Sequence, residues 1–267
     1  MLSIVIPTLN EEDHLPKLLK TIKSQTFKNY EIIVSDADSK DKTLKIAEIH
    51  GCKIVKGGLP AKGRNEGVRA AQGDLILFLD ADIELPSKDF IEKALKEFKD
   101  KELDLAACFL KPLGEVKFIK KNSLEFLFRI VNLLLVLFEK NSPFGAGSMI
   151  LVKKDFHQKI NGFDENIRMG EDTVYVRKGA RKGKFGILRS VKILWSVRRL
   201  QRESWLKVIL VYILCGILAY DEKKLEIFKK SVFKYEFGHY KEAKLPKINF
   251  FDFKKIKDIL KSKIKKV

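Results

Sequence analysis

An apolar strand that runs directly into two carboxylates constrains this chain more than any other feature. The run 75–79 is entirely apolar, and Asp80 and Asp82 follow it with only Ala81 between them. Such a run is typical of a central parallel strand whose carboxyl end opens toward a ligand crevice. Because side chains alternate along an extended chain, the two aspartates are predicted to share one side. They suit Mg2+ or Mn2+ with water and diphosphate oxygens as further ligands, although a solvated acidic turn is a simpler alternative.

The residues before this strand alternate apolar runs with helical patterns. Strands are predicted at 2–6, 31–34, 53–55 and 74–79, and helices at 13–24 and 44–50. This β-α-β-α-β-α-β rhythm predicts an α/β fold with a mostly parallel sheet and right-handed crossovers. Ligands of such sheets bind beyond the carboxyl ends of the strands. The polar loops at 7–11 and 36–38 are therefore expected beside the two aspartates.

The common glycine-rich phosphate cradles are absent. No Gly-x-Gly-x-x-Gly follows a predicted strand, and no glycine-rich loop ends in Lys-Ser or Lys-Thr. A metal would therefore have to help bind a phosphate. Arg64 offers a fixed fork of donors that suits a phosphate or carboxylate, and Asn65 beside it can read a polar edge. Alternatively, Arg64 pairs with Asp36 or Asp38 and only joins two loops.

The second half of the chain carries candidate groups for an acceptor. Gly145 and Gly147 precede an apolar strand at 149–152 and would let the backbone approach a ligand closely, although a bare turn is the alternative. Glu171 and Asp172 stand before a helix predicted over 173–182. Asp172 is then either a helix N-cap or a base held at a helix start.

Taken together, these motifs make the chain resemble the family 2 glycosyltransferases of the GT-A type. The resemblance rests on six segments: 3–12, 32–39, 63–67, 71–82, 162–165 and 170–172. It implies that the sheet half binds a nucleotide-diphospho-sugar together with a divalent cation, Mn2+ or Mg2+. One departure is that many relatives read Asp-Asp-Gly-Ser where this chain has Ser-Asp-Ala-Asp-Ser at 35–39, which leaves the base open.

The resemblance also implies roles for single residues. The nucleotide-sugar site would comprise Pro7, Thr8, Asn10, Glu11, Asp36, Asp38, Arg64, Asn65, Asp80, Ala81 and Asp82. Asp36 would face the base, while Asp80 and Asp82 would hold the metal, Asp82 more directly. Asp172 would be the general base that deprotonates the acceptor hydroxyl, with Glu171 as the second candidate. The implied reaction is a single in-line displacement at the anomeric carbon with inversion.

The strongest arginine cluster of the chain comprises Arg198, Arg199 and Arg202. Together with Gly145 and Gly147, these arginines are predicted to serve the acceptor or the donor diphosphate, or to bind a lipid phosphate. Ordinary surface pairing with neighbouring acidic residues is the alternative.

Two apolar segments, 124–138 and 205–220, are shorter than the roughly twenty residues of a membrane-spanning helix. In the first, Glu125, Arg129 and Asn132 fall on one face at helical spacing, which favours a helix lying in a membrane interface. Packing in the core is the alternative for both segments, and a short re-entrant hairpin is a further one for 205–220.

The charge of the chain points to an anionic surface. The net charge is +18, and the tail from Asp221 onward holds fifteen lysines against seven acidic residues and no arginine. Lysine without arginine favours anionic lipid over nucleic acid, and no nucleic-acid partner is expected. A solvated basic tail, or the lysine-rich surface of a thermophilic protein, is the alternative.

One GT-A domain is predicted over 1–200, with a nucleotide-sugar half (1–100) and an acceptor half (101–200), followed by a basic helical extension over 201–267. Because a strand begins almost at Met1, without a signal peptide, the protein is expected in the cytoplasm, peripheral on the inner face of the cell membrane. The three cysteines form neither a zinc pattern nor a disulfide pattern.

The sequence therefore predicts a metal-dependent inverting glycosyltransferase that acts on a membrane-borne acceptor, polyprenyl-linked or otherwise lipid-linked. A soluble or protein acceptor is the alternative. A nucleotidyltransferase would show a glycine-rich basic loop after the first strand, which 7–11 does not resemble. A non-catalytic membrane scaffold is the alternative outside enzymology, and the presence of Asp80, Asp82 and Asp172 argues against it.

Overall fold

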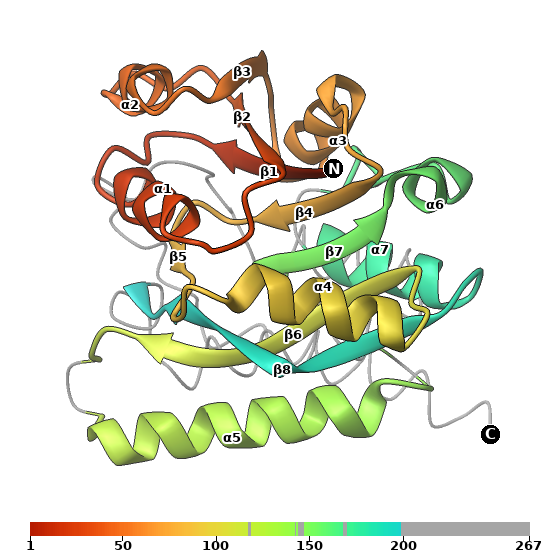
Figure 1. Cartoon of the computed structure of the whole chain (residues 1–267). Helices are drawn as coiled ribbons and strands as arrows, with labels where there is room; N and C mark the ends of the chain where they lie inside the picture. The colour runs from red at the N-terminus through yellow and green to blue at the C-terminus, as the bar shows by residue number, and fades with distance from the viewer. Residues whose placement is uncertain (117–118, 142, 144–146, 168–169, 199–267) are drawn as a thin grey trace, which may run out of the picture.

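The computed structural model describes residues 1–116, 119–141, 143, 147–167 and 170–198, which build one mixed sheet of eight strands flanked by helices (Figure 1). The predicted α/β fold class is confirmed. The predicted extension over 201–267, including the apolar segment 205–220, lies outside the described residues. The domain boundary near residue 200 stays a prediction.

The first half consists of β1 (Leu2–Thr8), α1 (Leu15–Lys23), β2 (Tyr30–Asp36), α2 (Thr43–Ile49), β3 (Lys53–Lys56), α3 (Pro60–Ala70) and β4 (Leu75–Leu79). Strand β1 pairs in parallel with β2 and β4, and β2 pairs in parallel with β3. The predicted alternation of strands and helices is confirmed. Every residue of β1 is buried, so this strand forms the centre of the first half.

Strand β1 runs through Pro7, where the sequence predicted its end at Ile6. Proline has no N–H to donate, which normally keeps it out of central strands. Strand β4, however, pairs with β1 only as far as Val5, so Pro7 lies where β1 has β2 alone as its paired neighbour. The strand can therefore continue through the proline to Thr8 and carry the following loop to the edge of the sheet.

The second half consists of β5 (Ile83–Glu84), α4 (Phe90–Asp100), β6 (Leu105–Leu113), α5 (Lys121–Phe138), β7 (Met149–Lys153), α6 (Lys154–Lys159), α7 (Glu171–Ala180) and β8 (Phe185–Ser196). The order along the sheet is β3-β2-β1-β4-β7-β6-β8-β5. Strand β7 runs antiparallel to both β4 and β6, while β6 and β8 are parallel. The carboxyl ends of β1, β4 and β6 therefore point the same way, to the left in Figure 1.

Helix α5 covers the predicted apolar segment 124–138 and lies along the end of the sheet opposite β2 and β3 (Figure 1). Its inner face buries Leu124, Phe128 and Leu135 in the core, and Phe128 packs against Trp195 of β8 with ring centroids 5.8 Å apart. Its outer face is exposed. The alternative of core packing is therefore confirmed for one face of the helix, and contact of the other face with a membrane interface stays a prediction. Within the described residues, no helix is both long and apolar enough to cross a membrane.

Asn132 corrects the polar face predicted for this helix. Its side chain accepts a hydrogen bond from Leu110 N and donates one to Leu110 O, both at 2.9 Å. It therefore faces β6, whereas Arg129 is exposed. The pairing of β6 with β8 shifts register between Cys108 and Phe109, and Asn132 satisfies backbone groups just beyond that irregularity.

Candidate functional site

The candidate site lies at the edge of the sheet where β1, β2 and β4 end, and elements from the whole described chain converge there. The loops after β1 and β4 bring Glu11 and Asp82 to the edge, and Asp36 is the last residue of β2. The start of α7 reaches it because Glu171 bonds Arg64. Arg198, two residues after the end of β8, reaches it through an ion pair with Asp82.

Asp36, the residue predicted to face a base, is buried and held by two hydroxyl-bearing residues. Its Oδ2 accepts hydrogen bonds from Thr8 Oγ1 at 2.9 Å and Ser39 Oγ at 2.6 Å, and its Oδ1 accepts one from Ser39 N at 2.8 Å. These bonds join the ends of β1 and β2 and fix the orientation of the carboxylate.

The loops around Asp36 are held in tight turns. Asn10 and Asp38 both have positive φ, at 55° and 70°. Asn10 N donates to Ser39 Oγ, and Asn10 Oδ1 accepts from Lys40 N, each at 2.8 Å. Asp38 is exposed and pairs with Lys40, whose hydrogen bond lowers the pKa of that carboxyl. Asn10 thus connects the two loops, while Asp38 points to solvent.

Pro7 and Ala81, also predicted for the site, are buried supports. A Cβ placed on Gly63 of α3 would lie 3.2 Å from Pro7 Cβ, so α3 packs closely over the end of β1. Ala81 is 4% exposed and belongs to the core. The aspartates on either side of it are half-buried at the edge.

Arg64 on α3 is 3% exposed and joins the two halves of the site. Its Nη2 donates to Asp80 Oδ1 at 2.8 Å, and its Nη1 donates to Glu171 Oε1 at 2.8 Å. The predicted alternative, in which Arg64 pairs with Asp36 or Asp38, is wrong. Burial lowers the pKa of Arg64, but the charges of Asp80 and Glu171 outweigh it and raise that pKa, so the guanidinium stays charged.

Asn65 is buried beside Arg64 and bonds to protein groups. Its Nδ2 donates to Phe163 O and Glu165 Oε1, and its Oδ1 accepts from Phe163 N, all at 2.9 Å. It thereby fixes the loop before α7, and the Phe163 ring lies 5.3 Å from the Arg64 guanidinium. The role predicted for Asn65 in a nucleoside pocket stays a prediction.

Arg198 connects the first and last described parts of the chain. It forms a two-pronged pair with buried Glu11, at 2.8 Å to Oε1 and 3.0 Å to Oε2, and its Nε lies 2.8 Å from Asp82 Oδ2. Burial raises the pKa of Glu11, but hydrogen bonds from His14 and Arg198 lower it, and the net shift is downward. Gly145, Arg199 and Arg202, the other predicted diphosphate or acceptor residues, lie outside the described residues.

Asp172 lies in the first turn of α7, next to Gly147. The N-cap of this helix is Gly170, so the predicted alternative in which Asp172 is the N-cap is wrong. A Cβ on Gly147 would collide with the Asp172 carboxylate, so the glycine makes room for that side chain. Burial, followed by the charge of Glu171, raises the pKa of Asp172. A carboxylate with a raised pKa can accept a proton at neutral pH.

Asp80 and Asp82 fit a cation held by two carboxylates. Burial, despite the nearby Arg64, raises the pKa of Asp80 to about 6. Within the described residues no group of three His, Cys, Asp or Glu side chains is arranged to hold a metal. Mg2+ and Mn2+ do not need one, because they bind through one or two carboxylates plus substrate phosphates and water. Arg64 and Arg198 each place a guanidinium 2.8 Å from one of the two carboxylates, so the position already attracts positive charge.

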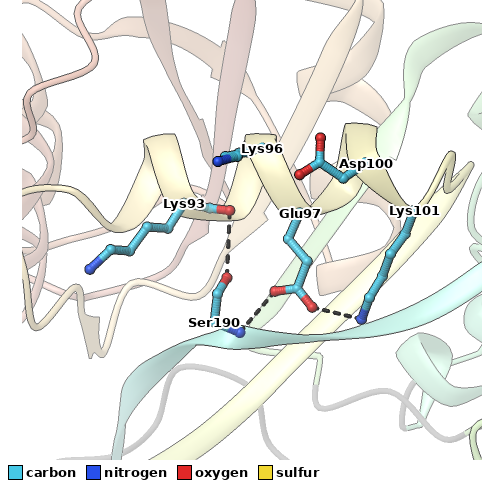
Figure 2. A pocket seen from close by; sticks show the side chains of 6 residues that line it. All are labelled: Lys93, Lys96, Glu97, Asp100, Lys101 and Ser190. Carbon is cyan, nitrogen blue, oxygen red and sulfur yellow. Dashed lines mark hydrogen bonds and ion pairs between the residues drawn. The ribbon is translucent and has the colours of Figure 1, made fainter.

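A cavity of about 310 Å³ lies elsewhere, between α4 and β8 (Figure 2). Its lining residues are Lys93, Lys96, Glu97, Asp100, Lys101 and Ser190. Glu97 is engaged with the backbone of β8 and with Lys101. We therefore interpret this cavity as a structural junction of helix and sheet.

The model of glycosyl transferase family 2 matches residues 3–160, more than half of the chain. The chain belongs to this family. Minor teichoic acid biosynthesis protein GgaB of Bacillus subtilis (strain 168) is 28% identical over 207 residues, 73% of this chain and 23% of that protein. GalNAc(5)-diNAcBac-PP-undecaprenol beta-1,3-glucosyltransferase of Campylobacter jejuni is 36% identical over 96 residues, 32% of this chain and 31% of that protein. The chain thus spans less than a third of either relative.

Solved glycosyltransferases share the fold. Mannosyltransferase PcManGT from Pyrobaculum calidifontis, in complex with GDP-Man and Mn2+, superposes with a TM-score of 0.62 at 21% identity, over 73% of this chain and 56% of that chain. S. aureus TarS 1-349, in complex with UDP, gives a TM-score of 0.59 at 18% identity, over 97% of this chain and 78% of that chain. The predicted GT-A fold and glycosyltransferase class are confirmed.

Sequence reasoning missed two polar residues of the site. Ser39 holds Asp36 through two hydrogen bonds, and His14 contacts both Glu11 and Arg198. Ser39 carried a signal, because a hydroxyl residue follows the acidic turn at 36–38. The contact of His14 with Arg198 had no local signal, since the two residues are 184 positions apart.

Proposed function

We propose that this glycosyltransferase transfers a sugar from a nucleotide-diphospho-sugar to a lipid-linked, membrane-borne acceptor with inversion at the anomeric carbon. The observation that carries the proposal is the link that Arg64 makes between Asp80, on the predicted donor side, and Glu171, next to Asp172 on the acceptor side. One buried guanidinium thereby links a proposed metal ligand, Asp80, to the start of the helix that carries the proposed general base.

Asp172 is the proposed general base. In a single displacement, its carboxylate takes the proton from the acceptor hydroxyl while that oxygen forms the new bond to the anomeric carbon and the nucleoside diphosphate leaves. Its raised pKa favours proton uptake near neutral pH, and the absence of a side chain on Gly147 allows the carboxylate to lie where it does. Glu171 is the weaker candidate because its carboxylate is engaged by Arg64.

Asp80 and Asp82 are the proposed ligands of a divalent cation, Mn2+ or Mg2+, which would stabilise the negative charge of the leaving diphosphate. The Arg198 guanidinium, 2.8 Å from Asp82 Oδ2, would compete with a cation for that oxygen. Its donors, which bond Glu11 and Asp82, would suit a diphosphate oxygen if they were released from these carboxylates. The complexes of structural neighbours with Mn2+ support the cation.

The acceptor is proposed to be lipid-linked because a relative is named for an undecaprenol-linked substrate. The protein would then work peripherally at the inner face of the cell membrane. A soluble or protein acceptor is the alternative. The base stays open, because one structural neighbour is in complex with GDP-Man and another with UDP.

Calorimetry with UDP, GDP and dTDP, each with and without Mn2+, tests the donor site. We expect Mn2+-dependent binding of one nucleotide, weakened at least about tenfold in Asp82→Ala because a direct ligand is lost. Asp74→Ala is the matched control, since Asp74 is a highly exposed aspartate at the opposite end of β4.

Two further results decide between interpretations. In Arg198→Met, Mn2+ alone should bind more tightly than in the wild type, because the competing guanidinium is gone, while the nucleotide binds more weakly. Failure of folded wild-type protein to bind any nucleotide would contradict the proposal and favour a non-catalytic scaffold.

A further inference from the structure

The exposed hydrophobic side chains of the described residues are concentrated on one helix. Among the described residues, seven large hydrophobic side chains are exposed. Five of them belong to α5: Phe126, Ile130, Leu133, Leu137 and Phe138. The other two, Met1 and Ile49, stand alone on the surface, which is normal for globular proteins. A cluster of exposed hydrophobic side chains on one helix is unusual for a globular protein and marks an interaction surface.

Four of these residues form a continuous stripe. Phe126, Ile130, Leu133 and Leu137 are spaced by four, three and four residues, so they share one face of the helix. Their exposed fractions are 62%, 40%, 56% and 62%. The opposite face, with Leu124, Phe128 and Leu135, already anchors α5 to the core. The outer stripe is thus not needed to hold the helix in the fold described here.

Basic residues surround the stripe. Lys120 and Lys121 are exposed at the start of α5, Arg129 in its middle and Lys140 just after its end. Of the neighbouring acidic side chains, Glu125 is half-buried, and Glu139 lies 3.1 Å from Arg189. The outer surface of α5 is therefore apolar along its axis and positively charged at its margins, the arrangement of helices that lie in the interface of an anionic membrane.

We propose that the outer stripe of α5, residues 126, 130, 133 and 137 with its basic margins, is the surface by which this protein lies on an anionic lipid bilayer. The charge of the chain favours an anionic bilayer over two other partners, the lysine-rich tail of the chain itself and a second copy of the chain. The tail from Asp221 onward has an excess of lysine, so its charge has the same sign as the margins. The same face of a second copy would be repelled likewise.

This placement gives the enzyme an orientation. Helix α5 packs on β6, at the end of the sheet opposite β2 and β3 (Figure 1). The carboxyl end of β2, with Asp36 predicted to face the base, would then be held away from the lipid, and the second half of the chain toward it. The inference deepens the proposed function and rests on it for the identity of the acceptor, but lipid binding is measured without any substrate.

Flotation of the full chain with lipid vesicles tests the surface. We expect binding to phosphatidylcholine vesicles containing about one third phosphatidylglycerol, weaker binding at high salt, and little binding to phosphatidylcholine alone. Leu133→Asp should lower the bound fraction about tenfold, because it removes one apolar side chain and adds a repelled charge. Ile49→Asp, an equal change at a 70% exposed position on α2, should leave binding unchanged.

A fluorophore at Leu133→Cys, in a Cys52→Ser and Cys215→Ser background, identifies what covers the stripe. A blue shift that appears only with anionic vesicles supports the proposal. A blue shift already present in vesicle-free monomer would show that the chain covers its own stripe, and one that tracks dimer formation would show a second copy; either result overturns it. Equal vesicle binding by Leu133→Asp and wild type would also overturn it.

Failure of the proposed function gives a different result. Asp172→Asn should float with vesicles as the wild type does even when it transfers no sugar. Conversely, Leu133→Asp should keep nucleotide binding in solution, because Leu133 is exposed on the outer face of α5 and the predicted nucleotide-sugar residues belong to other elements.

Discussion

Two carboxylate clusters in this protein have opposite environments, one at the junction of α4 and β8 and one at the candidate site. At the junction, Glu97 accepts backbone hydrogen bonds from Arg189 N at 2.9 Å and Ser190 N at 2.8 Å, and Lys101 Nζ lies 2.6 Å away (Figure 2). Burial raises the pKa of Glu97, but these bonds outweigh it and lower the pKa to about 2. The charged carboxylate is therefore stabilised by folding.

At the candidate site the balance is reversed. Asp172 accepts a hydrogen bond from the neighbouring Thr173 N at 2.7 Å, but burial and the charge of Glu171 raise its pKa. Burial also raises the pKa of Asp80 to about 6, in spite of the nearby charge of Arg64. Glu97 therefore has enough hydrogen bonds to stabilise its charge, whereas the charges of Asp80 and Asp172 remain unfavourable and would be relieved by a proton or a cation.

The largest expected effect is on catalysis. Asp172→Asn should lower the rate of sugar transfer about 10²- to 10⁴-fold, because the amide cannot accept the acceptor proton. Transfer of radiolabelled sugar from the nucleotide donor identified by calorimetry to a lipid extract measures it, with nucleotide binding retained.

Asp155→Asn is the matched control for this variant. Asp155 also lies in the first turn of a helix and accepts a hydrogen bond from the next backbone N–H, but it is exposed and belongs to α6. Its replacement should leave transfer unchanged. Full activity of Asp172→Asn would show that the comparison assigns the wrong cluster to catalysis.

Glu97→Gln should destabilise the protein by about 1–2 kcal/mol at neutral pH, because the amide keeps at most part of the hydrogen bonding. The folded pKa lies below the ordinary value of 4.5, so the stabilisation is present above that value and is lost as pH falls toward about 2. Urea unfolding at pH 7.5 and pH 3 should show the difference between variant and wild type shrinking. A loss of sugar transfer without a loss of stability would contradict a structural role.

The smallest expected effect is an increase in stability rather than a decrease. Asp172→Asn should stabilise the substrate-free protein by about 1 kcal/mol at pH 7.5, because a carboxylate with a raised pKa is costly to ionise in the folded state. Stability of the wild type should fall as pH rises from the ordinary value of 3.8 toward the raised pKa, and the gain should vanish near pH 4. A less stable variant at pH 7.5 would place Asp172 with Glu97 as a structural carboxylate.

Local patterns in the sequence were sufficient for the fold of the first half. The apolar runs that form β1, β2 and β4 are short and separated by helical patterns, so the parallel sheet and its ligand edge follow from local periodicity. Because ligands of such sheets bind beyond the carboxyl ends of the strands, the end of β2 with Asp36 and the segment after β4 with Asp82 were predicted to converge. Family motifs supplied the candidate roles, and most of those residues lie at or directly beneath this edge.

The sequence by itself determined the order of elements, the position of the two aspartates after β4 and the apolar character of α5. Only the tertiary structure decided which polar groups meet: Arg64 with Glu171 across 107 residues, Arg198 with Glu11 across 187, and the Asn132 amide with the backbone of β6. Periodicity indicates which face of an element is buried. Which of several compatible partners a polar side chain bonds, however, depends on the distances between the groups and on the cost of removing them from water. Those quantities exist only once the chain has folded.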